Sequence, residues 1–150
     1  MEGSISSEEF TFRDKVRKFV REDLNPISLQ VETSGEIPAT LVDKMRELGL
    51  FGLSIPEKYG GLGLSTLGEI LVYEELTQTN ACYRSRIGTS NSIGSMGILF
   101  AGTTNQKQAY LTRIANGEWT AGFGLTDADA GCEAANIKCL AHLEGDHGLL

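Results

Sequence analysis

This chain has few cysteines, no long apolar run and no excess of basic residues. The three cysteines, Cys82, Cys132 and Cys139, are odd in number and include no C-x-x-C pair. That pattern indicates neither a disulfide framework nor a zinc site, and it fits a reducing compartment. His142 and His147 are better explained as ordinary surface histidines than as metal ligands, so no metal is expected.

Other absences narrow the class of protein. The 150 residues carry 13 Lys and Arg against 20 Asp and Glu, a net charge of −7, which argues against nucleic-acid binding. No apolar stretch approaches the roughly 20 residues of a membrane span. The first ten residues, MEGSISSEEF, are acidic and show neither a signal peptide nor a transit peptide. We therefore expect a cytoplasmic protein, with the mitochondrial matrix as the alternative.

Helical periodicity dominates the first 117 residues. Capping boxes begin helices at Ser6 and Thr103, and Thr66 with Glu69 forms a third one. Apolar residues recur at helical spacing after each of them. Asn25-Pro26 is predicted to end the first helix, with a polar loop after it. The sequence predicts a helical domain of about five helices, over residues 7–24, 38–48, 66–79, 81–101 and 103–117.

The segment between residues 81 and 101 is unusually rich in small residues for a helix. It contains Gly88, Gly94 and Gly97, and each glycine inside a helix costs about 1 kcal/mol relative to alanine. Two interpretations compete. The small residues let neighbouring segments pack closely, or they form the wall of a pocket for a flat or elongated ligand.

The first strand pattern appears in WTAGFGLTDADAGCE, residues 119–133. Apolar and small residues alternate from Trp119 to Thr126, which predicts a half-buried strand. Gly122 and Gly124 leave one strand face bare, for a bend or for the close approach of a ligand. A second strand is predicted at residues 137–144, then a hairpin turn and the start of a third strand.

So few strands do not make a stable sheet, because their edges stay unpaired. The sequence therefore predicts a mainly α chain in two parts. Residues 1–117 form the helical domain, and residues 118–150 begin an incomplete β domain. Such a chain is expected to be the front part of a longer protein.

Three segments in this order resemble the acyl-CoA dehydrogenase family. They are LGLFGLSIPEKYGGLGLS, then YEELTQT, then GTTNQKQAYLTRIANGEWTAGFGLTDADAGCEAANIK, so the resemblance covers nearly the whole chain. It implies an N-terminal helical domain, a middle β-barrel domain and a C-terminal helical bundle. It also implies FAD as cofactor, an acyl-CoA thioester as substrate, electron-transfer flavoprotein as electron acceptor and a homotetramer for the full-length protein.

The resemblance assigns cofactor contacts to the segment that begins at Trp119. Phe123, Leu125 and Thr126 match positions that line the flavin ring. Gly131 and Cys132 match the end of that motif, near the flavin and the thioester arm of the substrate, so Cys132 is also a candidate substrate contact. In this family picture the glycine-rich segment 81–101 forms the wall of the acyl-chain pocket.

This chain departs from the family pattern at several positions. Asp127-Ala128 replaces the usual Glu-Pro, and Gly131-Cys132-Glu133 replaces Gly-Ser-Asp. A thiol is a weaker hydrogen-bond donor than a hydroxyl, so a polar contact at Cys132 is less secure. The family's catalytic glutamate belongs to the C-terminal domain, so no catalytic residue is expected here. Asp127, Asp129 and Glu133 are interpreted as turn residues.

The resemblance leaves two other functions open. A flavin monooxygenase or an acyl-CoA oxidase would share the helical domain and differ in residues beyond this chain. A non-catalytic helical module would instead use the apolar strand face to bind a partner protein. If the chain is instead part of an acyl-CoA dehydrogenase, as the resemblance implies, the isolated chain is expected to have little or no activity, because the base is missing.

Overall fold

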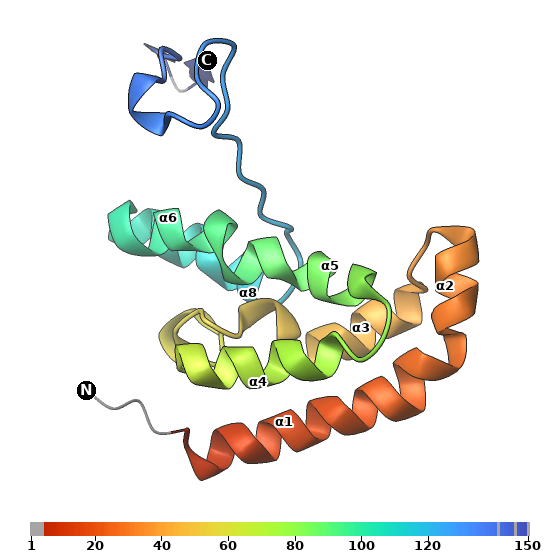
Figure 1. Ribbon diagram of the computed structural model, residues 1–150. Helices are drawn as coiled ribbons and strands as arrows, with labels where there is room; N and C mark the ends of the chain where they lie inside the picture. The colour runs from red at the N-terminus through yellow and green to blue at the C-terminus, as the bar shows by residue number, and fades with distance from the viewer. Residues whose placement is uncertain (1–4, 141, 146, 150) are drawn as a thin grey trace.

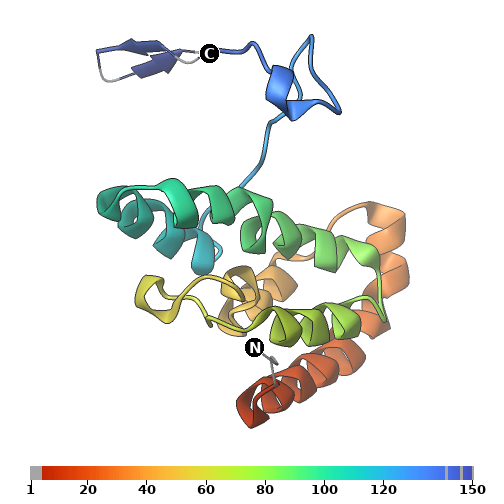
Figure 2. The same ribbon diagram turned by 60° about the vertical axis from the view of Figure 1, so that its left-hand side comes forward.

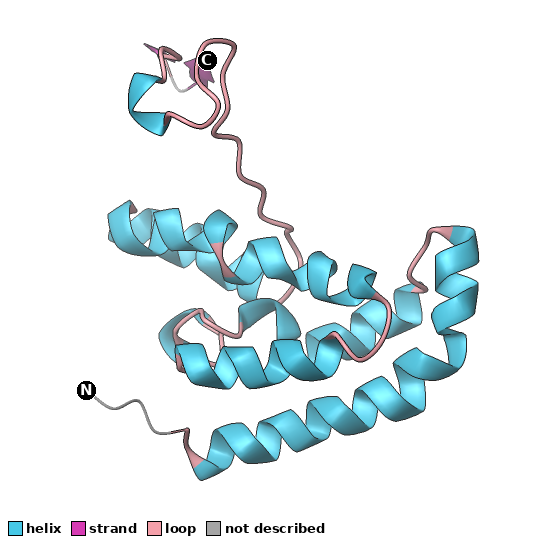
Figure 3. Ribbon diagram, in the orientation of Figure 1, coloured by secondary structure: helices cyan, strands magenta, loops and turns pink. Residues whose placement is uncertain are grey.

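The computed structural model describes residues 5–140, 142–145 and 147–149. Helices make up most of it, as Figures 1 and 3 show, which confirms the mainly α prediction. Helix α1 (Ser7–Phe19) lies along one side, with α4 (Thr66–Leu76) beside it. The pair α5 (Ala81–Asn91) and α6 (Ile93–Ala101) covers the opposite side, and the chain leaves the helical body there (Figure 2).

The first helical segment continues further than the sequence predicts. Ser6 and Glu9 form the expected capping box at the start of α1. The helix then widens into a π-helical turn at Val20–Leu24 and a 3-10 turn at Asn25–Ile27, and α2 (Ser28–Ser34) follows. Pro26 does not end the segment, because a proline in the first turn of a new helical stretch removes no required N–H bond. The predicted polar loop is therefore largely helix.

The glycine-rich connection that follows α3 (Ala39–Glu47) is ordered. It contains two 3-10 turns, Leu50–Gly52 and Glu57–Tyr59. Gly49 provides the left-handed turn with a φ of +75° that ends α3. The apolar residues of the connection point into the core, and four of them are fully or almost fully buried: Leu50, Phe51, Leu53 and Ile55.

Helix α4 begins at Thr66, and its N-cap is Ser65 rather than the predicted Thr66. The sequence predicts a central helix apolar on more than one face, but only Gly68, Val72 and Leu76 are buried. Leu67 and Ile70 are 40% and 46% exposed. The uncovered face of α4 is therefore apolar within the part of the chain described here.

The predicted helix 81–101 is broken at Ser92, whose φ of −129° and ψ of −110° are not helical. This break separates α5 from α6. The predicted fifth helix is also divided, into α7 (Thr104–Gln106), a π-helical turn at Lys107–Leu111 and α8 (Thr112–Ala115). Gly117 ends it with a φ of +72°, as its position predicts.

Two apolar clusters form the interior. The larger joins α1 to α5 around Val16, Met45 and Phe51, which are 0% exposed. The smaller lies between the Leu50–Ser65 connection and α8, and it consists of Ile55, Tyr59, Leu111, Ile114 and Ala115. The described residues after Gly117 contribute almost nothing to either cluster, and among them only the partly buried Ala121 packs against the smaller one.

The C-terminal part differs from the predicted strands. Residues 119–126 run extended away from the helices (Figure 1) but form no strand, because no described segment pairs with them. After a 3-10 turn at Ala134–Asn136, strand β1 (His142–Glu144) pairs antiparallel with β2 (His147–Leu149). Gly145 lies in the turn between them with a φ of +61°. The predicted second strand is thus confined to its last three residues.

Candidate functional site

The segment that starts at Trp119 is anchored to the helices over its first three residues. The backbone N–H of Trp119 donates to the carbonyl of Arg113 at 3.0 Å. The hydroxyl of Thr120 accepts from the Arg86 guanidinium at 3.1 Å, and the Ala121 N–H donates to Ser90 Oγ at 3.5 Å. These contacts hold residues 119–121 against α5 and α8.

Trp119 is also held by its side chain. The Arg113 guanidinium lies 4.5 Å from the centre of the indole ring, and the Tyr110 ring lies 6.0 Å from it. Both neighbours come from the helical region before Gly117. The direction in which the chain leaves the helical body is therefore set by side chains of three elements and not by a strand ladder.

Close packing between α6 and the segment explains one of the helix glycines. A Cβ built on Gly94 would lie 2.4 Å from the Cβ of Ala121 and 2.8 Å from the carbonyl oxygen of Thr89. No side chain fits at that position. At Gly94 the packing interpretation of the glycine-rich helix is confirmed.

The same helix has an open side around Gly97. A Cβ built there would meet nothing within 4 Å. A shallow, largely apolar cavity of about 350 Å³ lies beside it, lined by Gly97, Ile98, Ala101, Gly102, Gln106 and Tyr110. Close packing and an open wall thus occupy different turns of α6.

The predicted flavin contacts lie beyond Ala121, where the chain is uncovered. Phe123 is 55% exposed and Leu125 is 44% exposed. Thr126, Gly131 and Cys132 are also exposed. A Cβ built at Gly122, Gly124 or Gly131 would meet nothing within 4 Å. The chain therefore presents apolar side chains next to bare backbone, and this surface has no covering within the described residues.

Asp127 organises the loop after Thr126. Its Oδ1 accepts the N–H groups of Asp129 at 2.9 Å and Ala130 at 2.7 Å. Its Oδ2 accepts the N–H groups of Lys138 at 2.8 Å and Cys139 at 3.2 Å. These backbone donors hold the pKa of the Asp127 carboxyl below its usual range, and the N–H of Lys138 has the largest effect. The interpretation of Asp127 as a turn residue is confirmed. The sequence did not predict that the same carboxylate also bonds Lys138 and Cys139 at the far end of the loop.

Sequence patterns did not reveal the buried amide that fixes the glycine-rich connection. Asn91 is 2% exposed, and its side chain bonds three backbone groups. Its Oδ1 accepts from Leu53 N–H at 2.6 Å, and its Nδ2 donates to the carbonyls of Leu50 at 2.7 Å and Ile87 at 3.2 Å. One asparagine at the end of a helix carries no distinctive spacing, so only the fold identifies this role.

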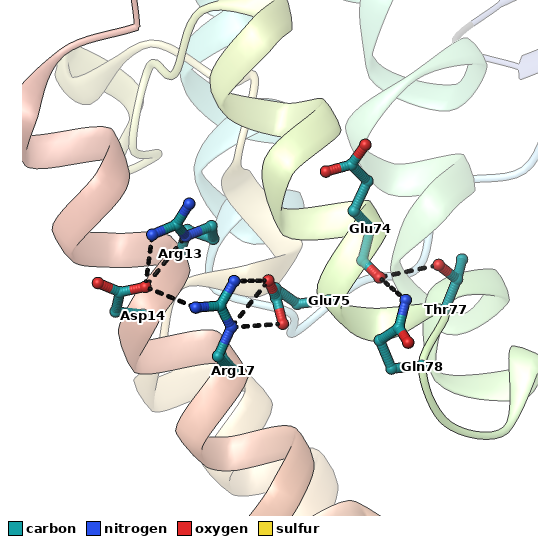
Figure 4. A network of polar contacts seen from close by, with 7 residues as sticks. All are labelled: Arg13, Asp14, Arg17, Glu74, Glu75, Thr77 and Gln78. Carbon is teal, nitrogen blue, oxygen red and sulfur yellow. Dashed lines mark hydrogen bonds and ion pairs between the residues drawn. The ribbon is translucent and has the colours of Figure 1, made fainter.

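Glu75, the second residue of the acidic pair Glu74-Glu75 at the end of α4, forms a salt bridge with α1. The Arg17 guanidinium contacts both carboxylate oxygens of Glu75, with its closest nitrogen at 2.6 Å, and Figure 4 shows the two side chains facing each other. Asp14 accepts from Arg17 on the other side at 3.4 Å. The Glu74 carbonyl accepts from Thr77 and Gln78. This cluster joins α1 to α4.

One tyrosine beside α5 has a strongly shifted pKa. Burial, strengthened by the nearby Glu69 carboxylate, raises the pKa of Tyr73 to about 12. Burial also raises the pKa of Glu69 itself. The Arg84 guanidinium lies 5.2 Å from the Tyr73 ring centre. The phenol therefore stays neutral near pH 7 and is a poor base.

The described ranges contain neither a cluster of metal-ligand side chains nor a helix suited to a membrane. No group of three or more His, Cys, Asp and Glu side chains among them is placed to hold a metal ion. None of the described helices has both the length and the apolar character needed to cross a membrane.

Comparison with known proteins identifies the family. The sequence model of the acyl-CoA dehydrogenase N-terminal domain matches residues 6–118. The chain is 32% identical over 138 residues to 3-(aryl)acrylate reductase of Clostridium sporogenes, which is 92% of this chain and 37% of that protein. This chain belongs to the acyl-CoA dehydrogenase family.

Solved structures agree with this assignment. A glutaryl-coenzyme A dehydrogenase in complex with glutaryl-CoA superposes with a TM-score of 0.82 at 31% identity, over 99% of this chain and 38% of that chain. An acyl-CoA dehydrogenase of Bacillus anthracis complexed with FAD gives a TM-score of 0.78 at 30% identity, over 92% of this chain and 24% of that one. The chain thus spans well under half the length of these relatives.

Proposed function

We propose that this chain is the N-terminal portion of an FAD-dependent acyl-CoA dehydrogenase, an enzyme that introduces a double bond between the α and β carbons of an acyl-CoA thioester. One observation carries the proposal. The family match ends at residue 118, and the next residues form an anchored segment whose apolar, glycine-spaced surface is uncovered.

The exposed part of this segment fits a flat aromatic cofactor. Phe123 and Leu125 supply apolar surface, and the open backbone at Gly122 and Gly124 leaves room for a ring to lie close. The Thr126 hydroxyl can donate a hydrogen bond to a polar ring edge. Gly131 and Cys132 would lie near the flavin and the thioester arm. Bound FAD would supply the hydride acceptor, while the protein would supply orientation and electrostatics.

We expect the base for the α proton to be missing from this chain. Both oxygens of Asp127 are occupied by backbone N–H groups, and a carboxylate with a lowered pKa is a weak proton acceptor. Asp129 is paired with Lys138 at 3.0 Å. We therefore place the base outside this chain and expect no turnover by the chain alone.

The rest of the proposal follows the family resemblance. Residues 1–117 would be the helical domain and residues 118–150 the beginning of a β-barrel domain. The complete protein would be a homotetramer, would pass electrons to electron-transfer flavoprotein and would work in the cytoplasm. The open side of α6 near Gly97 would face the acyl chain, since its lining is mostly apolar.

The test is a flavin titration of the purified chain, followed by absorbance and by quenching of Trp119 fluorescence. We expect saturable FAD binding that Thr126→Ala weakens and Thr104→Ala, at an exposed position of α7, leaves unchanged. Butyryl-CoA and glutaryl-CoA should give no dye reduction. A colourless oligomer would support the partner-binding module instead, and dye reduction by the chain alone would refute the missing base.

A further inference from the structure

We infer that Asp127 is a positioning residue that fixes the Gly131-Cys132 turn relative to Thr126, so that both ends of the proposed flavin-binding loop are presented together. This inference rests on the proposed function for the identity of the ligand. The arrangement of the loop itself rests on the bonds that Asp127 makes.

The two oxygens of the Asp127 carboxylate bond different parts of the chain. Oδ1 closes the local turn by accepting from Ala130 at 2.7 Å, and the Asp127 N–H donates back to the Ala130 carbonyl at 3.1 Å. Ala130 is 3% exposed, although its neighbours on both sides are exposed. A compact turn is therefore formed immediately before Gly131.

Oδ2 bonds the returning part of the loop. It accepts from the N–H groups of Lys138 and Cys139, which are 11 and 12 residues further along the chain. Both ends of the loop are therefore hydrogen-bonded to the side chain of Asp127, the residue directly after Thr126. Without this carboxylate, four backbone N–H groups lose their acceptor and the position of Cys132 is no longer tied to Thr126.

An amide cannot replace this carboxylate. Asparagine has the same shape, but its nitrogen is a donor and would face two N–H donors at the Oδ2 position. Glutamate keeps both acceptor oxygens on a side chain one methylene longer. The second link across the loop, Lys138 Nζ to Asp129 Oδ2 at 3.0 Å, has side chains 74% and 61% exposed. Such an exposed pair contributes little.

The experiment compares Asp127→Asn, Asp127→Glu and the control Asp129→Asn in the 150-residue chain. Amide hydrogen exchange of Lys138 and Cys139, measured by NMR, should be about tenfold faster in Asp127→Asn, since each loses a charge-assisted bond. Asp129→Asn should leave these rates within about twofold of the wild type. Unchanged exchange in Asp127→Asn would overturn the inference.

FAD affinity is the second measurement. If Asp127 stabilised the loop without positioning a ligand, replacing it would leave the FAD affinity unchanged. We expect Asp127→Asn to weaken FAD binding about tenfold and Asp127→Glu to recover most of it. Fast exchange with wild-type affinity would show that Asp127 orders the loop without positioning a ligand, which overturns the inference. If the wild type binds no FAD, the proposed flavin site is wrong for this chain, and the exchange rates alone decide whether Asp127 holds the loop.

Discussion

Gly94 and Ala121 are packed so closely that the Cβ of Ala121 would lie 2.4 Å from a methyl group added to Gly94. This contact joins α6 to the segment that carries every residue of the proposed flavin site. It lies one residue before Gly122, where the continuously exposed stretch 122–126 begins. The orientation of the site therefore depends on a helix that contributes none of the proposed flavin contacts.

Replacing Gly94 should disturb this contact. Gly94→Ala should lower the free energy of unfolding by about 1–3 kcal/mol, the usual cost of overpacking. It should also shift Trp119 emission to the red as the segment moves off α6. Gly97→Ala is the matched control, because its methyl group meets nothing within 4 Å and a helical alanine adds up to about 1 kcal/mol. Equal effects of the two changes on urea unfolding would contradict the packing argument.

The buried amide of Asn91 should be one of the costliest side chains to remove. Asn91→Ala leaves Leu53 N–H and Leu50 C=O without a partner in the interior, so we expect a loss of about 2–4 kcal/mol in the free energy of unfolding. Asn116 is exposed and accepts one backbone bond, from Glu118 at 2.9 Å. Asn116→Ala should therefore cost under about 1 kcal/mol. A small effect at Asn91 would mean that the connection 50–65 is held by its apolar side chains alone.

Glu9 should make stability sensitive to acid. The Ser65 hydroxyl, followed by the N–H of Ser6, lowers the pKa of the Glu9 carboxyl, which is 8% exposed. A carboxyl whose folded pKa is depressed stabilises the fold above its unfolded pKa, about 4.3, and loses that contribution as the pH falls through the folded pKa.

We therefore expect Glu9→Gln to lower stability at pH 7 and to flatten the decline below pH of about 4.5. Thermal unfolding between pH 3 and pH 7 would measure both effects. Glu8→Gln is the control. Its carboxyl lies on the surface, so it should change the melting temperature much less. The Glu9 mechanism is wrong if Glu9→Gln declines in acid as steeply as the wild type.

The Arg17–Glu75 pair should show measurable coupling, unlike most surface ion pairs. The Glu75 side chain is 12% exposed, and its carboxylate accepts hydrogen bonds from two nitrogens of the Arg17 guanidinium. A double-mutant cycle with Arg17→Ala and Glu75→Ala should give a coupling energy of about 1 kcal/mol or more. Lys18 and Glu22, 72% and 63% exposed at 3.8 Å, provide the comparison, with about 0.3–0.5 kcal/mol expected for such an i,i+4 pair. Arg17→Lys should retain only part of the coupling, since lysine cannot make the paired contact.

The mainly helical fold and most of its boundaries could be predicted because their causes are local. The Ser6 and Thr103 capping boxes and the left-handed turns at Gly49 and Gly117 act within a few residues, so the sequence alone reveals them. The prediction was wrong at two places, for different reasons. Pro26 lies in the first turn of a new helical stretch, where it removes no required N–H bond, so the helical segment continues. Residues 119–126 alternate like a strand, but no other described segment pairs with them, and such a partner is not a local property of the sequence.

By itself, the sequence determined the family, the helical framework and the position of the candidate site in the chain, since these follow from short motifs and their order. Only the tertiary structure decided how the site is oriented and held. The contacts of Gly94 with Ala121 and of Asn91 with Leu53 join residues 27 and 38 positions apart in the chain. The bonds from Lys138 and Cys139 to Asp127 likewise close a loop of more than ten residues. No spacing rule links such residues, because chain folding alone brings them together.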